Sequence, residues 1–457
     1  MNDDDKCYTL FMSLPKAPKR GQSIIGVIIA IGIFVILSQA VATLAFSAYD
    51  LISYTRARIS ARHIALESIE IVRNAPYDDV GTIGGIPTGI FTQEQDVSRN
   101  GQNYTIRTRV NYIDDPFDGV SPDDTLPTDY KRVRVDVSWG GVAASNFSEV
   151  SVVTDVAPRG IETTAGGGTL SILAFNALGQ PVPQAEVLIV ANSTTPPVNA
   201  TYFTSDTGRV TLPGSPICNT CYQITVTKAG MSTDRTYSTT EVENPVKPLV
   251  SILEGQLTEV SFAVDTFARL SLTTYGEEPG FPALPNQIIR IRGEKTIGTN
   301  GLDEPVYKFD QEIVTDGSGQ LTIEELEWDN YHISLPTDST VEIAGTNPVS
   351  PMSVNPAQEV SLLISLVADS ASSLLARFED GSSLLVASVA AMLEDGVGYE
   401  ASKSSGVAGV ANFGQVFFDG LEDKIYTLTA TASGFLELTT DISINGDVSE
   451  RIILSPE

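Results

Sequence analysis

The chain has 457 residues, enough for roughly three domains, and carries a formal net charge of −29. An exterior this acidic repels nucleic acid, so we expect no nucleic-acid partner. Only two histidines, His63 and His332, and three cysteines are present. These counts leave little for histidine chemistry and exclude a fold held together by many disulfides.

The first 50 residues divide into a basic leader and an apolar run. Lys16, Lys19 and Arg20 precede Gly21, and no charged residue then follows until Asp50. A helix needs about 20 apolar residues to cross a bilayer core, so this run is long enough to span one. The basic leader should stay cytoplasmic and place later residues outside. The alternative is a secretory signal cleaved near "AVATLAFSA", although such signals have a shorter apolar core.

The apolar run continues into an amphipathic pattern. The stretch "DLISYTRARISARHIALESIEIVR", which begins at Asp50, contains neither glycine nor proline. Its apolar residues at helical spacing predict one buried stripe, formed by Ile59, Leu66, Ile69 and Val72. We therefore expect a single helix from about residue 24 to 74, roughly 75 Å long at 1.5 Å per residue, that Pro76 ends.

These features resemble the N-terminus of a type IV prepilin, and "ALESIEIVRNAPYDDVGTIGG" is similar to the corresponding region of minor pilins and pseudopilins. The resemblance covers residues 16 to about 155. It implies that a prepilin peptidase cuts between Gly21 and Gln22 and that the new amine of Gln22 is methylated. It also implies that the helix packs against other pilins in a filament through the residues that follow the cut: Ile24, Ile25, Gly26 and Val27.

Two positions depart from the pattern of that family. Gln22 replaces the usual phenylalanine, and Gly26 replaces a glutamate. A carboxylate inside a bilayer costs about 2.5 to 3.5 kcal/mol, so it persists only with a partner. In pilins the proposed partner is the N-terminal amine of a neighbouring subunit. A subunit at the filament tip has no neighbour ahead, so Gly26 favours a tip position; the other interpretation is that different contacts recruit this subunit.

Strand patterns follow the helix in residues 76–157. Asn100-Gly101 separates two alternating runs, which is the strongest short signal for a hairpin. Together with "YKRVRVDVSW" and "SEVSVVTDVA", these runs predict a small antiparallel sheet against the helix. One face of this sheet carries four arginines: Arg107, Arg109, Arg132 and Arg134. A patch for DNA uptake is one interpretation, but an ordinary charged solvent face is favoured because the chain is acidic.

The loop "DDPFDGVSPDDTLPTD" gathers acidic residues inside this region. Calcium binds several oxygens in flexible loops, and some pseudopilins bind it here. The candidate ligands are Asp114, Asp115, Asp118, Asp123 and Asp124. The spacing fits no strict calcium motif, so a solvated acidic turn is the alternative.

A linker at residues 158–168 leads to a threefold repeat. Each copy places a glycine before a strand, then a strand that begins with tyrosine, and closes with an alternating strand: "LTEVSFAVD", "AQEVSLLISL" and "DVSERIIL". The first copy, with "LSILAFNALGQPVPQAEVLI", resembles the carboxypeptidase regulatory-like domain, an Ig-like or transthyretin-like β-sandwich. We expect three β-sandwich domains at residues 169–265, 266–367 and 368–457.

Cys218 and Cys221 lie in "PICNTCYQI", just before a predicted strand. No second cysteine pair or nearby histidine supports a zinc site, and a redox dithiol would normally open a helix. In an exported protein we expect a local disulfide, with free thiols as the alternative. Cys7 should leave with the leader.

The expected fold is therefore α+β and all-β: one long helix with a small pilin-like sheet, then three β-sandwiches. No catalytic motif occurs, so we expect no enzyme and no cofactor other than the calcium considered above. The resemblance implies a minor pilin or pseudopilin of a type IV pilus or type II secretion-like filament, at its tip, that presents the sandwiches for adhesion or interaction. It would pass from the inner membrane to an extracellular filament. The alternative is an uncleaved, single-pass surface protein, and an anchored glycan-active enzyme has no residues to support it.

Overall fold

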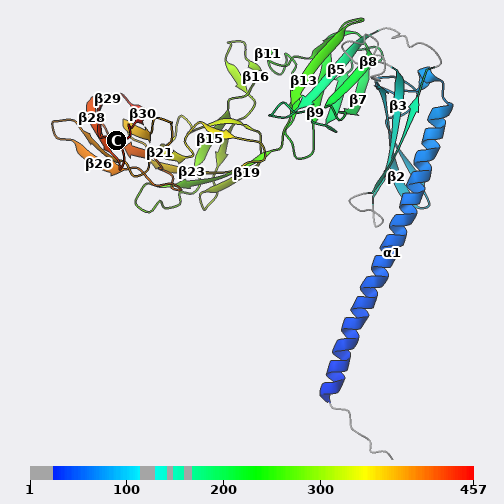
Figure 1. The fold of residues 1–457 in the computed structure, drawn as a ribbon, viewed down its shortest axis with the longest axis horizontal. Helices are drawn as coiled ribbons and strands as arrows, with labels where there is room; N and C mark the ends of the chain where they lie inside the picture. Colours follow the sequence, from blue (N-terminus) through cyan, green and yellow to red (C-terminus); the bar gives the residue numbers. More distant parts are fainter. Residues whose placement is uncertain (1–23, 114–128, 141–147, 159–166) are drawn as a thin grey trace, which may run out of the picture. The chain divides into compact units, whose positions relative to one another are not determined.

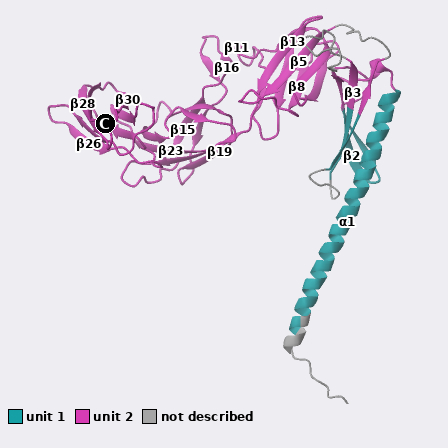
Figure 2. Cartoon of the chain, viewed as in Figure 1, with its two compact units in different colours: residues 1–74, 94–108, 134–153 teal, residues 75–93, 109–133, 154–457 magenta. Residues whose placement is uncertain are grey.

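The structure is a computed structural model that describes residues 24–113, 129–140, 148–158 and 167–457. One long helix opens the described chain, and strands in several sheets make up almost all the regular structure after it (Figure 1). This arrangement confirms the predicted fold class. The chain divides into two compact units (Figure 2), one formed by residues 1–74, 94–108 and 134–153 and the other by residues 75–93, 109–133 and 154–457.

The helix α1 runs without interruption over Ile24–Asn74, its predicted extent. Its 51 residues correspond to about 77 Å of helix. It ends at Asn74 because Pro76 disfavours the helical conformation in the residue before it. A short 3₁₀ turn, η1 (Tyr77–Asp79), follows.

The C-terminal part of α1 packs through small side chains. The buried residues on this stretch recur every three to four positions: Ala57, Ala61, Ile64, Ala65, Ile69 and Val72. Three alanines allow the backbone to approach the sheet closely, and the hydroxyl of Tyr104 donates a 3.3 Å hydrogen bond to the carbonyl of Ala57. Tyr104 is also buried beside Trp139.

The predicted stripe on this helix is therefore half wrong. Ile69 and Val72 are buried, but Ile59 is 54% exposed and Leu66 is 41% exposed. The alanines form the contact because they fit the narrow gap beside the sheet, and the larger Ile59 and Leu66 lie on the outer face. Residue size decides the packed face here, and hydrophobicity alone does not reveal it.

The sheet has the strand order β1-β2-β3-β4. Its strands are β1 (Glu94–Arg99), β2 (Gln102–Ile113), β3 (Tyr130–Trp139) and β4 (Glu149–Val156). The turn between β1 and β2 has φ of 56° at Asn100 and 78° at Gly101. Two successive positive φ angles are those of a type I′ turn, so the predicted hairpin is confirmed.

Three β-modules follow, each with one apolar core. Module 1 has the sheets β13-β5-β8 and β10-β9-β6-β7, with β12 paired to β9. Its strands are β5 (Gly168–Phe175), β6 (Glu186–Ala191), β7 (Val198–Phe203), β8 (Arg209–Ser215), β9 (Cys218–Thr227), β10 (Asp234–Arg235), β12 (Val250–Ile252) and β13 (Leu257–Ala263). Ile86, from the segment after the helix, is buried in this core.

Module 2 has the sheets β19-β14-β23-β21 and β18-β15-β20-β22. Its strands are β14 (Ala268–Tyr275), β15 (Ile288–Gly293), β18 (Asp310–Val314), β19 (Gln320–Leu326), β20 (Asp329–Ser334), β21 (Val341–Asn347), β22 (Met352–Val354) and β23 (Glu359–Ala368). Module 3 has the sheets β27-β24-β30 and β26-β25-β28-β29. Its strands are β24 (Ser373–Glu379), β25 (Ala390–Glu394), β26 (Glu400–Ser404), β27 (Gln415–Phe418), β28 (Ile425–Thr431), β29 (Leu438–Ser443) and β30 (Asp447–Ile453).

The three modules share the pairing of their first strand with their last. In each, the first strand pairs in parallel with the last: β5 with β13, β14 with β23, and β24 with β30. The repeated tyrosines are buried at equivalent points, and each hydroxyl bonds to backbone just upstream. Tyr222 donates to the carbonyl of Pro216 and Tyr331 to that of Glu327, both at 2.7 Å, and Tyr426 accepts from a backbone NH at 3.0 Å. These tyrosines therefore anchor the loop that enters the central strand.

Backbone pairing joins modules 1 and 2. Strand β11 (Asn244–Pro245) pairs with β16 (Thr296–Thr299), which pairs in turn with β17 (Pro305–Tyr307). Modules 2 and 3 meet through the buried side chain of Gln415. Its Nε2 donates to the carbonyl of Thr346 at 2.7 Å and its Oε1 accepts from the same residue's NH at 3.2 Å. The Gln415 side chain thus makes the two backbone hydrogen bonds that a residue of a neighbouring strand would make with Thr346.

Candidate functional site

The N-terminal half of α1 is an uncovered apolar surface. Its large apolar side chains between residues 28 and 52 are all at least 52% exposed: Ile28, Ile29, Ile31, Ile33, Phe34, Val35, Ile36, Leu37, Val41, Leu44, Phe46, Leu51 and Ile52. The described stretch Ile31–Asn74 contains a window of mean hydropathy 2.0, long and apolar enough to cross a membrane. A helix that is apolar on every side needs lipid or other helices around it.

Three further large apolar side chains of the helix are exposed beyond Ile52, among charged residues. Ile59 and Leu66, on the face away from the sheet, are joined by Ile71, which is 58% exposed. A cleft of about 870 Å³ lies beside Ile59, between the helix from Tyr49 to Ser60 and the β1–β2 turn at Asn100. The continuous apolar surface of the helix therefore ends near Ile52, and this surface is the main candidate site of the chain.

The predicted processing and packing residues occupy the start of this surface. Gly21 and Gln22 lie outside the described residues. Ile24, Ile25, Gly26 and Val27 form the first turn of α1, and the structure describes only their backbone.

Three of the four arginines of the predicted face pair with carboxylates of the same chain. Arg107 pairs with Glu94 at 2.9 Å, Arg132 with Asp155 at 2.7 Å, and Arg134 with buried Asp136 at 2.8 Å. The paired Arg132 guanidinium lowers the pKa of the Asp155 carboxyl below its ordinary value. Arg109 instead stacks over the ring of Phe203, 4.2 Å from its centroid. The face matches the ordinary charged surface favoured in the sequence.

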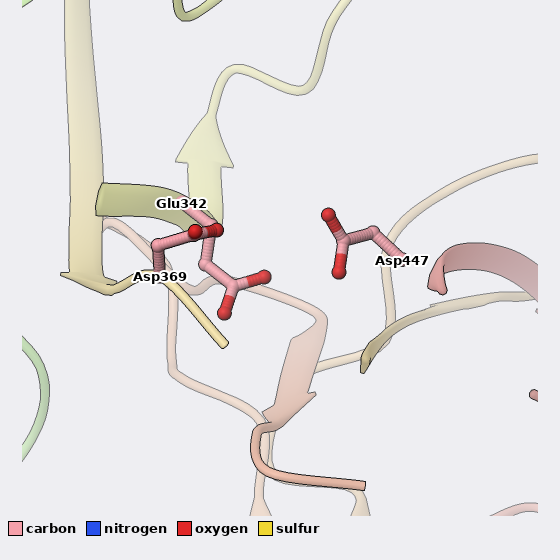
Figure 3. Close-up of side chains that lie close together, drawn as sticks. All are labelled: Glu342, Asp369 and Asp447. Atoms are coloured by element: carbon pink, nitrogen blue, oxygen red, sulfur yellow. The ribbon is translucent and has the colours of Figure 1, made fainter. Parts of the chain in front are cut away.

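The candidate calcium ligands lie outside the described residues: Asp114, Asp115, Asp118, Asp123 and Asp124. A different acidic group occurs elsewhere, where the carboxylates of Glu342, Asp369 and Asp447 come within 4.8 Å of one another (Figure 3). Glu342 is buried, and its Oε1 accepts hydrogen bonds from the NH and hydroxyl of Ser370. These residues are far apart in the sequence, so no spacing could reveal the group.

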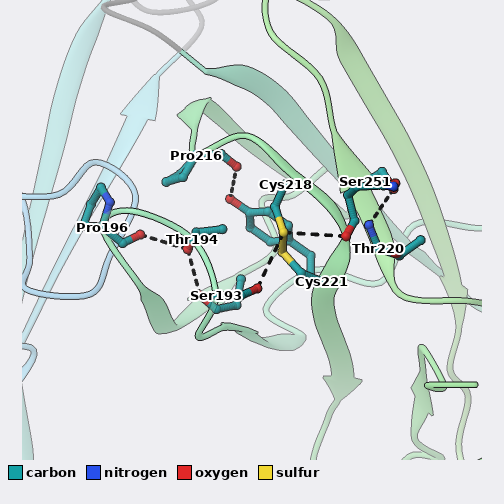
Figure 4. Close-up of a disulfide and its surroundings, with 11 residues drawn as sticks. Ser193, Thr194, Pro196, Pro216, Cys218, Thr220, Cys221 and Ser251 are labelled. Atoms are coloured by element: carbon teal, nitrogen blue, oxygen red, sulfur yellow. Dashed lines mark hydrogen bonds between the residues drawn. A yellow bond between two sulfur atoms is a disulfide. The ribbon is translucent and has the colours of Figure 1, made fainter. Parts of the chain in front are cut away.

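Cys218 and Cys221 are joined by a disulfide at the start of β9 (Figure 4). The loop that they close is also held from outside, because the NH of Thr220 donates to the hydroxyl of Ser251 at 2.7 Å. The Oγ of Ser193 lies 3.7 Å from the sulfur of Cys218. The pair is therefore placed to fasten the start of β9, where both cysteines pack against the core of module 1.

No family model and no curated protein matches this chain. Among solved structures, the Bacillus anthracis TIE protein matches with 13% identity over 80% of this chain and 73% of its own, at a TM-score of 0.19. A streptococcal ancillary pilin matches with 11% identity over 64% of this chain and 99% of its own, at 0.17. The major pilin subunit BcpA of Bacillus cereus matches with 11% identity over 63% and 99%, at 0.18.

The fold and the candidate site together define a class: a chain with one long apolar helix able to cross a membrane, followed by several β-modules.

Proposed function

We propose that this chain is a minor pilin or pseudopilin of a type IV pilus or type II secretion-like filament. A prepilin peptidase cuts it between Gly21 and Gln22, and Gln22 is then methylated. The apolar part of α1 anchors the chain in the inner membrane and later packs against the helices of other pilins. Modules 1 to 3 stay outside the cell and present a surface for adhesion or interaction.

The observation that carries this proposal is the division of one uninterrupted helix into two parts. The first part is apolar and exposed, and the second is fastened to a sheet by Ala57, Ala61 and Ala65. A signal peptide that is removed has no reason to continue as the core helix of a folded unit. A pilin helix first lies in the membrane and then packs against the helices of other subunits. It therefore needs an apolar part for these contacts and, in the same helix, a part that carries the folded unit.

The remaining site residues belong to the same proposal. The disulfide of Cys218 and Cys221 fits an exported module, since such bonds persist in oxidising compartments. We further propose calcium ligands among the acidic residues before β3: Asp114, Asp115, Asp118, Asp123 and Asp124. We also propose that residues 169–265, 266–367 and 368–457 are the three displayed domains.

Mass spectrometry of the mature N-terminus tests the processing step. In cells that contain the prepilin peptidase, the chain should begin at Gln22 and carry one added methyl group. The variant Gly21→Val should keep its leader, because the peptidase reads that glycine, while Gly32→Ala should be cut normally because the structure places nothing within 4 Å of a Cβ at Gly32. An intact leader in the wild-type chain would favour the uncleaved surface protein, and a cut near Ala48 would favour a secreted one.

A further inference from the structure

In each module the chain enters and leaves through two neighbouring strands. The first and last strands are β5 and β13 in module 1, β14 and β23 in module 2, and β24 and β30 in module 3, and each pair is parallel. These three ladders keep one register along their whole length. The antiparallel ladders that join β5 to β8 and β14 to β19 each contain a register shift. The parallel ladders therefore share one construction and one place in the path of the chain.

Backbone hydrogen bonds also close the two ends of such a ladder. In module 1 the NH of Thr169 donates to the carbonyl of Gln256, and the NH of Val264 donates to the carbonyl of Phe175, both at 2.9 Å. The ladder therefore extends to the points where the chain enters β5 and leaves β13.

The segments between the modules are short and fastened. Residues 264–267 connect β13 to β14, and residues 369–372 connect β23 to β24. The carbonyl of Asp265 accepts a 2.8 Å hydrogen bond from the NH of Ser232, and the NH of Asp369 donates to the carbonyl of Thr340 at 2.9 Å. These segments have little slack, so tension on the chain passes from the last strand of one module to the first strand of the next.

The parallel direction of the two strands decides how a ladder responds to tension. In a parallel pair, the start of the first strand and the end of the last strand lie at opposite ends of the ladder. Tension then slides the strands past each other and loads all their hydrogen bonds together. In an antiparallel pair the same two points would lie at one end, and the bonds would break one after another. Forced unfolding is governed by the unfolding rate, which is slower when several bonds must break at once.

We propose a mechanical function for modules 1 to 3: the ladders β5–β13, β14–β23 and β24–β30 resist tension along the chain between α1 and a partner that the modules hold. That a partner exerts this tension rests on the proposed function. The resistance of each ladder depends only on the module itself, so its test is separate from the test of processing at Gly21.

Pulling one module from two different points tests the ladder in module 3. The full chain in detergent carries Cys7→Ser, one handle after Glu457 and a second handle at either Ala371→Cys or Ser382→Cys, both exposed positions. Ala371 precedes β24, so its handle slides β24 along β30. Ser382 follows β24, so its handle opens the ladder from one end.

The measured quantity is the lifetime of module 3 at a constant force. Because at least two more hydrogen bonds break together in the sliding geometry, the lifetime should be at least about tenfold longer there. The backbone contacts of residues 455–457 are loaded in both geometries and cancel in the comparison. Equal lifetimes in the two geometries would overturn the proposal.

Two adjacent residues of β30 provide matched variants. The NH of Leu454 donates to the carbonyl of Glu379 at 2.8 Å, so alternate NH groups of β30, including that of Glu450, face β24, and that of Ser449 faces away. Both side chains are exposed, and β30 is at the edge of its sheet. Glu450→Pro therefore removes a hydrogen bond of the ladder, whereas Ser449→Pro removes none.

Glu450→Pro should shorten the lifetime about tenfold in the sliding geometry. It should change the opening geometry little, because opening begins at the other bonds near Glu379. Ser449→Pro should leave both lifetimes close to those of the wild-type chain. Equal shortening in both geometries would indicate general destabilisation and contradict the proposal. If Glu450→Pro does not fold, the two geometries of the wild-type ladder still decide the question.

Discussion

At the scale of single residues, the turn between β25 and β26 depends on one carboxylate. Oδ1 of Asp395 accepts 2.9 Å hydrogen bonds from the NH groups of Val397, Gly398 and Tyr399, while Oδ2 accepts one from Lys424 at 2.8 Å. The Lys424 ammonium, followed by these NH groups, holds the pKa of Asp395 well below its usual range. A carboxylate whose pKa falls on folding stabilises the folded state above its unfolded pKa, about 3.9 for Asp.

The resulting prediction concerns acid unfolding of module 3. Asp395→Asn keeps one acceptor for the turn but removes the charge, so the midpoint of thermal unfolding should fall at pH 7. Wild-type stability should decline as the pH drops below about 4, because Asp395 of the unfolded chain then binds a proton that the folded state still excludes, and the variant should show a shallower decline. Calorimetry from pH 7 to about 2 measures both effects. Lys424→Met should shift the profile in the same direction, and an unchanged profile in both variants refutes this assignment.

The sequence predicts a single helix or hairpin correctly where neighbouring residues alone determine it. The bounds of α1 follow from an uncharged run, the absence of proline and the break at Pro76, and the β1–β2 hairpin follows from Asn100-Gly101. The packed face of α1 was not predictable in full, because the fit of Ala57 and Ala61 depends on a sheet that forms later in the chain.

The insertion in the second repeat, "GEKTIGTNGLDEPVYKF", has a role that its sequence does not show. It forms the hairpin of β16 and β17, and β16 pairs with β11 of module 1. Gly298 lies at the contact, where an added Cβ would come 2.3 Å from the carbonyl oxygen of Asn244. Only glycine fits this approach, so the residue controls the pairing between the two modules.

Replacing this glycine should loosen the junction. If Gly298→Ala costs about 1.4 kcal/mol, within the usual range for overpacking, opening of the β11–β16 pair rises about tenfold. A lysine-specific protease should then cut after Lys247 about ten times faster, provided that reclosing outpaces cleavage. Gly317→Ala is the matched control, because nothing lies within 4 Å of its added Cβ. Equal cleavage of the two variants would show that the pairing does not hold the junction.

At the scale of the whole molecule, each subunit carries three modules on one helix. The volume of these modules limits where the proposed subunit fits in a filament. Packed helices lie about 8 to 10 Å apart. A domain of about 100 residues has a radius of gyration near 13 Å, so three modules in one subunit exceed the space beside close-packed neighbours. The acidic exterior, with a net charge of −29, further opposes crowding of identical copies.

These arguments lead to the last prediction, that the chain occurs in few copies at filament ends. At an end the space ahead is free for modules 1 to 3. Type IV pilins, which this N-terminus resembles, have a glutamate where the chain has Gly26. On the proposed assignment its loss points the same way, since a leading subunit has no amine ahead to pair with and an unpaired carboxylate is costly in lipid. Immunogold labelling against residues 266–457 should therefore mark the tips of filaments. Labelling spread evenly along the shaft would refute the tip position. It would not affect the proposed pilin assignment, which rests on α1 and on processing at Gly21 and is tested separately by mass spectrometry of the N-terminus.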